Sequence, residues 1–277
     1  AGEVRATLAA LEPLAREWSA RVEQDDAVSK VSIVGVGMRT HTGVAQRMFA
    51  ALAAERITVK MITTADIKIS ALVAKADGVR ALRAVHQAFD LGKPRSLQGA
   101  PVVPLPSAHR DLAGLTRQLS DMEGILVSGV ALEADQGRVT VIGLPDVPGN
   151  SSRVFQAIAT GGIVVDMIVQ NHSAGQPELS FSVPRGELWK AADLARKAAQ
   201  AIAPTAQIAV DESIAIIHVG GVGMRTHTGV ARKMFGALAS RGINIAMINT
   251  SEVRLSVVVE RQRGEEALAC LKEVFGL

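Results

Sequence analysis

The chain has 277 residues, of which 48 % are hydrophobic and 21 % charged, and it carries a formal net charge of +3. This balance is that of a globular protein and excludes a disordered chain, which would be poor in apolar residues and rich in net charge. The single cysteine, Cys270, excludes an intramolecular disulfide scaffold. No apolar run approaches the ~20 residues that span a bilayer and no signal-peptide pattern opens the sequence, so we expect a cytoplasmic protein.

A long internal repeat governs the organisation of the chain. Residues 35–54 read GVGMRTHTGVAQRMFAALAA and residues 221–240 read GVGMRTHTGVARKMFGALAS, an identity of 16 in 20 positions at an offset of 186. The likeness continues more weakly, because residues 62–70 resemble residues 248–256. The repeat is therefore about 185 residues long, and the chain holds one and a half of them.

Residues 1–27 predict a helix and then a strand, and they resemble the stretch from Gly186 onwards. We expect them to be the remnant of a truncated first unit, comprising its second helix and last strand. Residues 28–91, the leading unit, predict strand, helix, strand, strand and helix. Residues 92–123 hold four of the ten prolines and predict a linker.

Residues 138–211, the middle unit, predict the full order strand, helix, strand, strand, helix and strand. Its strands are expected at 139–144, 163–170, 178–183 and 207–210, and its helices at 151–160 and 187–202. Residues 212–277, the last unit, repeat this order without an obvious closing strand. We expect a strand at 124–134 to complete the last unit from outside.

This β-α-β-β-α-β order predicts an α+β fold of the ferredoxin-like kind, in which each antiparallel sheet carries its helices on one face. The sheet edges of such units are open to partner strands. We therefore expect the units to pair side by side, and we expect a homo-oligomer.

Several functions do not fit this pattern. A nucleic-acid reader of this topology needs aromatic residues that stack on bases, but the chain has no tyrosine, and Phe49, Phe155 and Phe235 stand at core spacing on helices. A dinucleotide loop needs an earlier third glycine than Gly43 or Gly229. No metal-ligand spacing or catalytic pattern stands out. The chain by itself is predicted to be non-catalytic, and to bind neither nucleic acid nor a membrane.

One kind of site recurs where a first strand turns directly into a first helix. Residues 145–149 read PDVPG, and residues 38–43 and 224–229 both read MRTHTG. A helix N-terminus offers unpaired N–H groups to a small carboxylate, and Asp146 suits an ammonium group. A free amino acid satisfies both ends. The alternative is that Asp146 is only a turn residue.

The motifs GVGMRTHTGV with ITTADIKIS or INTSEVRLS, and VTVIGLPDVPGNSSRVFQAI with VDMIVQNHS, closely resemble the regulatory region of aspartokinases, which is built from ACT domains. The resemblance implies a four-ACT type, with the domains in two tandem pairs. It implies that the parent protein phosphorylates L-aspartate with ATP and is inhibited by lysine or threonine. ATP and Mg²⁺ would belong to a kinase domain whose K-F-G-G-T-S-type segment does not occur here. No cofactor or catalytic residue is expected in this chain.

The same resemblance assigns candidate effector-binding residues. On the middle unit they are Asp146, Pro148, Gly149 and Gln170. On the last unit they are Met224, His227, Gly229, Asn244, Ile245, Thr250, Ser251 and Glu252. Asp146 would bind the ammonium group, backbone N–H groups the carboxylate, and Asn244 with Glu252 the side chain. The alternative function is chiefly oligomerisation, with vestigial effector sites.

Overall fold

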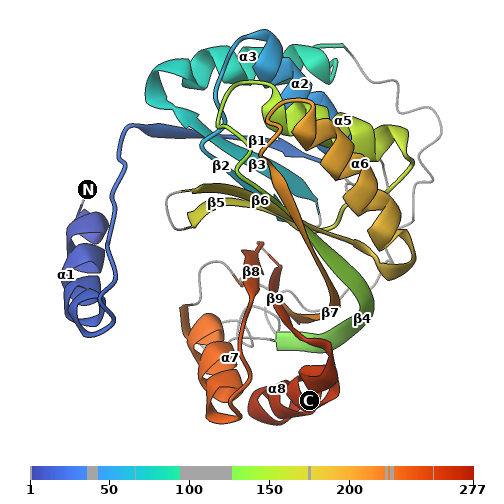
Figure 1. Cartoon of the computed structure of the whole chain (residues 1–277). Coiled ribbons are helices and arrows are strands. Elements are labelled where there is room, and N and C mark those ends of the chain that lie inside the picture. Colours follow the sequence, from blue (N-terminus) through green and yellow to red (C-terminus); the bar gives the residue numbers. More distant parts are fainter. Residues whose placement is uncertain are drawn as a thin grey trace, which may run out of the picture.

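A single antiparallel sheet with helices on its faces makes up the body of the protein (Figure 1). The computed structural model describes residues 2–35, 43–65, 67–93, 127–173, 176–221, 224, 228–251 and 253–277. The nine strands of the described part run in the order β1-β3-β2-β5-β6-β4-β7-β9-β8. The predicted ferredoxin-like architecture is confirmed, because antiparallel strands of three successive units join edge to edge in this sheet.

The leading unit alternates buried and open positions along its strands. Its elements are β1 (Val28–Val34), α2 (Val44–Ala54), β2 (Met61–Ala65), β3 (Lys68–Ala74) and α3 (Gly78–Ala88). Val31 and Ile33 on β1 point to the helices and are each 5 % exposed, whereas Ser32 between them lies on the open face of the sheet. There Ser32 shares a hydrogen bond of 2.8 Å with Ser70 on β3. Because successive side chains point to opposite faces of the strand, one face of this sheet lies in the core.

The middle and last units share two long strands. Their elements are β4 (Val127–Ile142), α5 (Asn150–Thr160), β5 (Ile168–Ser173), β6 (Gln176–Pro184), α6 (Leu188–Gln200), β7 (Gln207–Gly221), α7 (Thr228–Ser240), β8 (Met247–Thr250), β9 (Arg254–Glu260) and α8 (Gly264–Phe275). Strands β4 and β7 pair antiparallel from Ile142 opposite Gln207 to Val127 opposite Gly221, with register shifts between Glu133 and Arg138. Residues 127–133 thus pair with the last unit, and β7 runs on past the predicted end at residue 210 because no turn residue interrupts it.

Leading and middle units share one hydrophobic core. The ring of Phe49 on α2 packs against that of Phe155 on α5 in a tilted arrangement, with 5.5 Å between the ring centroids, and Phe155 contacts Phe181 of β6 at 5.6 Å. The last unit has a core of its own around α7 and α8. Its open sheet face meets that of the middle unit, where Met247 and Met167 belong to one small apolar cluster. The sheet therefore folds back so that the open faces of these two units meet.

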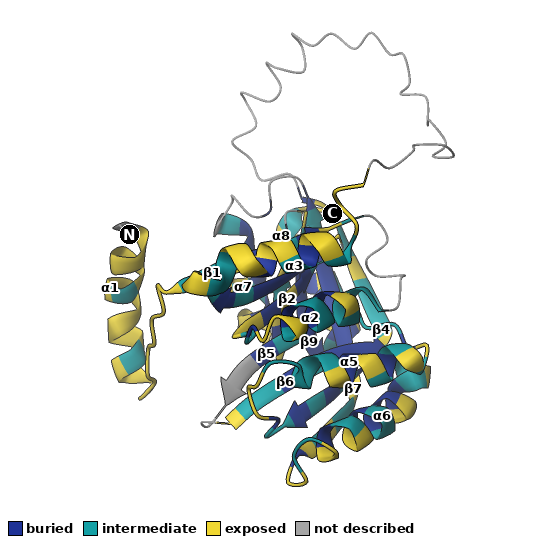
Figure 2. Ribbon diagram, turned by 90° about the horizontal axis from the view of Figure 1, so that it is seen from above, coloured by how far each residue is buried: buried dark blue, intermediate teal, exposed yellow. Residues whose placement is uncertain are grey.

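The N-terminal residues do not follow the prediction in full. Helix α1 (Gly2–Glu17) forms, but residues 18–27 contain no strand. In Figures 1 and 2 this helix stands away from the body, and most of its residues are exposed. A strand needs a neighbour for its backbone groups, and the described sheet offers none beside residues 18–27. The predicted linker lies outside the described residues apart from Gly92 and Lys93.

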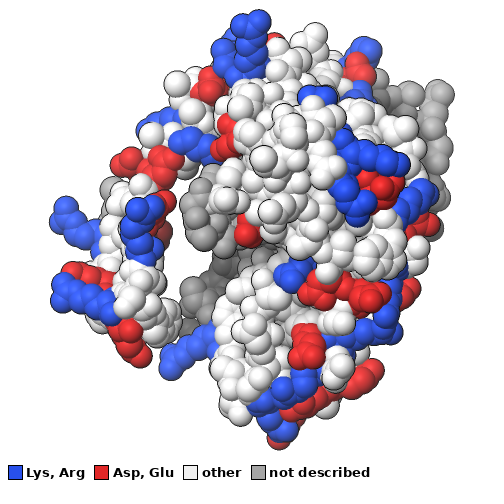
Figure 3. Space-filling view, viewed as in Figure 1, with Lys and Arg blue, Asp and Glu red and all other residues white. Residues whose placement is uncertain are grey.

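The middle unit departs from expectation at one strand. Strand β5 begins at Ile168, whereas residues 163–167 were expected to be extended strand as well. These residues still make contacts of the strand kind, because the N–H of Asp166 donates to Ser182 O at 3.1 Å. On the face shown in Figure 3 basic and acidic side chains are interspersed.

Candidate functional site

The loop between β4 and α5 in the middle unit holds the candidate residues Asp146, Pro148 and Gly149. Gly149 precedes the helix with φ of +96°, a left-handed conformation that favours glycine. Gly149 has no side chain to cap α5. Asn150, the first residue of α5, donates from its side-chain amide to Pro145 O at 2.9 Å and from its backbone N–H to Val147 O at 3.2 Å. The start of α5 thus has no side-chain cap, and the N–H groups after Asn150 are the ones that the anion-binding prediction concerns.

A small cavity lies beneath this loop. Its lining residues are Leu144, Pro145, Asp146, Ser151, Gln170, Pro177, Glu178 and Leu179. Asp146 and Gln170, two of the predicted residues, thus come together from the loop and from β5. The cavity volume is about 10 Å³, which is room for about one water molecule.

Gln170 connects this cavity to the leading unit. Its side chain is buried (5 % exposed), and its Nε2 donates to the backbone O of Val59 at 3.2 Å. Its Oε1 is also buried and accepts no hydrogen bond from the described residues. Buried polar atoms are nearly always paired, so this oxygen marks a place for a donor. Gly149 touches the leading unit as well, since a Cβ built on it would lie 3.5 Å from the Ala53 Cβ.

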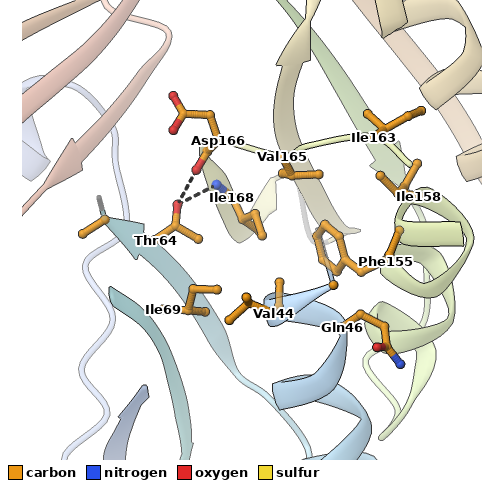
Figure 4. Close-up of a pocket in the computed structure, with 14 residues that line it drawn as sticks. Val44, Gln46, Thr64, Ile69, Phe155, Ile158, Ile163, Val165, Asp166 and Ile168 are labelled. Carbon is orange, nitrogen blue, oxygen red and sulfur yellow. Dashed lines mark hydrogen bonds between the residues drawn. The ribbon is translucent and has the colours of Figure 1, made fainter. Parts of the chain in front are cut away.

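A second cavity lies at the interface between the leading and middle units, and residues of the leading unit that are equivalent to Gly149 and Gln170 line it (Figure 4). Gly43 stands 106 positions before Gly149 and Thr64 stands 106 before Gln170. Thr64 Oγ1 accepts from the N–H of Ile168 at 2.9 Å and donates to Asp166 O at 3.3 Å. The cavity measures about 40 Å³ and its labelled walls are mostly apolar, from α2, α5 and the segment before β5.

The expected partner face of the last unit does not lie at the Asp146 loop. Asn244 is exposed, and Ile245 borders a separate hollow of about 460 Å³ over the open face of the middle unit. The segment of the leading unit at the same repeat position, Thr58–Val59, occupies the predicted place instead. The helix packing of Phe49 on Phe155 selects the leading unit as the neighbour.

The remaining candidates of the last unit serve other contacts. Met224 is buried in the core of that unit, and Gly229 is half-buried. Ser251 shapes the turn into β9, because its N–H and Oγ both donate to Arg254 O, at 2.7 and 3.2 Å. Thr250 is exposed beside it. His227 and Glu252 lie outside the described residues.

Polar pairs across the first and third strands of each unit were missed by sequence reasoning. Besides Ser32 with Ser70, Thr140 shares a hydrogen bond of 2.9 Å with Ser180, and His218 one of 2.7 Å with Ser256. All three pairs lie on the open sheet face. The signal that reveals them is the alternation of a polar residue between two apolar ones. These pairs place polar side chains on the sheet face that the helices do not cover.

Two structural features are absent from the described part of the chain. No helix there is long and apolar enough to cross a bilayer. Nor do these ranges contain a group of three or more His, Cys, Asp or Glu side chains arranged to hold a metal ion.

Known proteins resemble this chain in sequence and in fold. The ACT domain family matches residues 31–89 and 217–275. An aspartokinase of Pseudomonas aeruginosa is 39 % identical over 157 residues, which cover 56 % of the chain and 38 % of that protein. The aspartate kinase from Synechocystis superposes with a TM-score of 0.75 at 31 % identity, over 93 % of the chain and 41 % of that protein. The ligand-free regulatory subunit of aspartate kinase from Thermus thermophilus gives a TM-score of 0.51 at 37 % identity, over 54 % of the chain and 99 % of that subunit.

The repeated ferredoxin-like units and these matches define a regulatory protein built from ACT domains. Nearly the whole Thermus regulatory subunit is covered at 37 % identity. The chain belongs to the aspartokinase family, and it covers the regulatory part. It spans 38 % of the length of the Pseudomonas relative.

Proposed function

We propose that this chain is the effector-binding region of an aspartate kinase and binds lysine or threonine as a feedback inhibitor in the Asp146 cavity. The parent enzyme would phosphorylate L-aspartate with ATP. The catalytic groups, ATP and Mg²⁺ would belong to a kinase domain of the same polypeptide.

The observation that carries the proposal is the unpaired Oε1 of Gln170 in the same cavity as the Asp146 carboxylate. The site thus has two oxygen acceptors at one end, which favour a cation, and the start of α5 at the other end, which favours an anion. An ammonium group would donate to Asp146 and Gln170. A carboxylate would accept from the N–H groups that follow Asn150 at the start of α5.

The size of the cavity connects binding to a change of shape. About 10 Å³ does not hold an amino acid, so the effector enters only if the loop moves away from its neighbours. Those neighbours include the leading unit, through Val59 and Ala53. An effector would therefore favour an arrangement of the two units in which the cavity is open. Its difference in affinity for the two arrangements sets how far it shifts their populations.

The second candidate function is assembly of subunits with vestigial effector sites. The continuous core between the leading and middle units favours it, because such packing stabilises a scaffold without any ligand. The two functions differ in one property of Asp146. Assembly does not require its charge, whereas effector binding does.

Isothermal titration calorimetry of the whole chain with L-lysine and with L-threonine tests the proposal. We expect binding of at least one of them, and a loss of at least tenfold in affinity for Asp146→Asn, which keeps the shape and removes the charge. Asp193→Asn on α6, where the Asp193 side chain is 45 % exposed, is the matched control and should bind as the original chain does. An absence of heat from both amino acids up to millimolar concentration would overturn the proposal, and so would unchanged binding by Asp146→Asn.

A further inference from the structure

The open sheet face of the leading unit carries one lysine on each side of a row of hydroxyl groups. Ser32 on β1 and Ser70 on β3 stand opposite each other and share the hydrogen bond of 2.8 Å, and Thr63 on β2 stands opposite Ser70. Lys30 is two residues before Ser32, and Lys68 is two residues before Ser70. Because β1 and β3 are antiparallel, the two lysines lie on opposite sides of this row.

The two lysines are therefore well separated. Lys30 stands opposite Leu72, which lies four residues after Lys68 on β3. At about 3.3 Å per residue, this places their Cα atoms roughly 13 Å apart along the strand direction. A lysine is a compact charge on a flexible stem, so two lysines at this spacing suit two separate anionic groups better than a single one.

A hollow of about 340 Å³, which we call the leading hollow, lies over this face. Lys30, Lys68, Thr63 and Ser70 are among its lining residues, and residues 248–251 of the last unit line it from β8 and the turn that follows. The described lining residues include no Asp or Glu. Its volume falls in the range of sites that hold small molecules.

The middle unit carries different charges at the equivalent positions. There the hydroxyl row is formed by Thr140 and Ser180, with Arg138 two residues before the first and Glu178 two residues before the second. Arg138 and Glu178 both line the hollow of about 460 Å³ over that face, and Arg138 also donates to Asp211 at 2.9 Å. The middle unit thus has a cation at one end of its row and an anion at the other, whereas the leading unit has a cation at both.

We propose that the leading hollow binds a small dicarboxylate, with one carboxylate at Lys30 and the other at Lys68. Two ammonium groups balance the two charges of such a ligand, whereas a bisphosphate would bring about three to four negative charges. Met61, Leu72 and Ile248 also line the hollow and give it an apolar wall, which suits the carbon chain between the carboxylates. The bound ligand would connect the leading and last units, because both contribute to the walls.

Isothermal titration calorimetry of the whole chain at fixed ionic strength, with pimelate, heptanoate and malonate, tests the proposal. Pimelate has a carboxylate at each end of a long carbon chain, heptanoate keeps the chain but has one carboxylate, and malonate holds two carboxylates close together. We expect pimelate to bind at least tenfold more tightly than either of the others. Lys30→Gln and Lys68→Gln should each lower the affinity for pimelate at least tenfold. Lys197→Gln on α6 removes the same charge from an exposed side chain outside the hollow and should leave the affinity unchanged. Circular dichroism confirms that the variants fold.

An absence of heat from pimelate up to 10 mM would overturn the proposal. So would equal affinities for pimelate and malonate or for pimelate and heptanoate, because the site would then not recognise two separated charges. Pimelate binding that either lysine variant of the hollow leaves unchanged, or that Lys197→Gln weakens equally, would overturn it as well. The proposed effector site is tested separately. The Asp146 cavity shares no described lining residue with the leading hollow, so Lys30→Gln should bind lysine or threonine as the original chain does.

Discussion

Gln170 on β5 donates a hydrogen bond from Nε2 to the backbone O of Val59 across 3.2 Å, and it thereby joins the middle unit to the leading unit at the edge of the Asp146 cavity. The same side chain contributes an unpaired oxygen inside the protein. One residue thus takes part both in the contact between units and in the candidate site. Ligand binding and the arrangement of units are linked through it.

Replacement of Gln170 by leucine separates these two roles. Loss of the hydrogen bond to Val59 costs about 1 kcal/mol, and removal of a buried unpaired oxygen offsets a similar amount. We therefore expect a free energy of unfolding within about 1 kcal/mol of the original, together with at least a tenfold loss of effector affinity. Denaturant unfolding and calorimetric titration measure the two quantities. Unchanged affinity would show that Oε1 does not contact the ligand.

Thr64 makes a comparable contact at the second cavity. Valine at this position keeps the shape but leaves the buried N–H of Ile168 without its acceptor, which costs about 1–3 kcal/mol. Thr63→Val, its exposed neighbour on the same strand, should change stability by no more than about 0.5 kcal/mol. Chemical denaturation of both variants provides the comparison. Equal stabilities would mean that the Thr64 hydroxyl contributes nothing to the interface.

Phe49 lies at the centre of the shared core. Its truncation to alanine should cost about 3–5 kcal/mol, because Phe49 is 2 % exposed and its ring packs against Phe155. The equivalent Phe235 is only partly buried, so Phe235→Ala should cost clearly less when both are measured at low micromolar concentration. Thermal unfolding followed by circular dichroism distinguishes them. A larger loss for Phe235→Ala would contradict the difference in packing between the two repeats.

Acid should weaken a contact at the start of α8. The Arg263 guanidinium donates to the Glu266 carboxylate at 2.7 and 3.0 Å and thereby lowers the pKa of Glu266 from its ordinary 4.5. A lowered pKa in the folded state means that the unfolded chain binds the proton more readily. The stabilisation is thus present above the ordinary pKa and lost as the pH falls through the folded value.

Glu266→Gln removes this dependence. The variant should show a slightly flatter fall of melting temperature than the original chain as the pH falls below about 4.5, and the effect is small because the pair is exposed. Melting curves between pH 3 and 7 measure it. Parallel curves for the two proteins would contradict the assignment.

The sequence predicted the units and most of their elements because periodicity and turn residues act locally. The helix from Asn150 to Thr160 and the hairpin strands of each unit follow directly from the apolar spacing. That Asp146 and Gln170 line one cavity was also predictable, through the resemblance to aspartokinases. Which of two nearly identical repeats faces the Asp146 loop was not, because Thr58–Val59 and Asn244–Ile245 carry similar local signals. Packing of Phe49 on Phe155 makes that choice, and it is a tertiary contact.

The segment before the leading unit shows the same limit. Residues 18–27 were expected to form a strand because of their place in the repeat, but a strand forms only against another strand. The described sheet provides none there, and α1 alone keeps its predicted structure.

A crystal structure of the chain soaked or co-crystallised with the amino acid that binds more tightly tests the central claim most directly. We expect the ligand beneath the Asp146 loop, its ammonium group within about 3 Å of Asp146 or Gln170 and its side chain directed to the Thr58–Val59 segment. A ligand held instead against Asn244 and Ile245, away from the Asp146 loop, would contradict it.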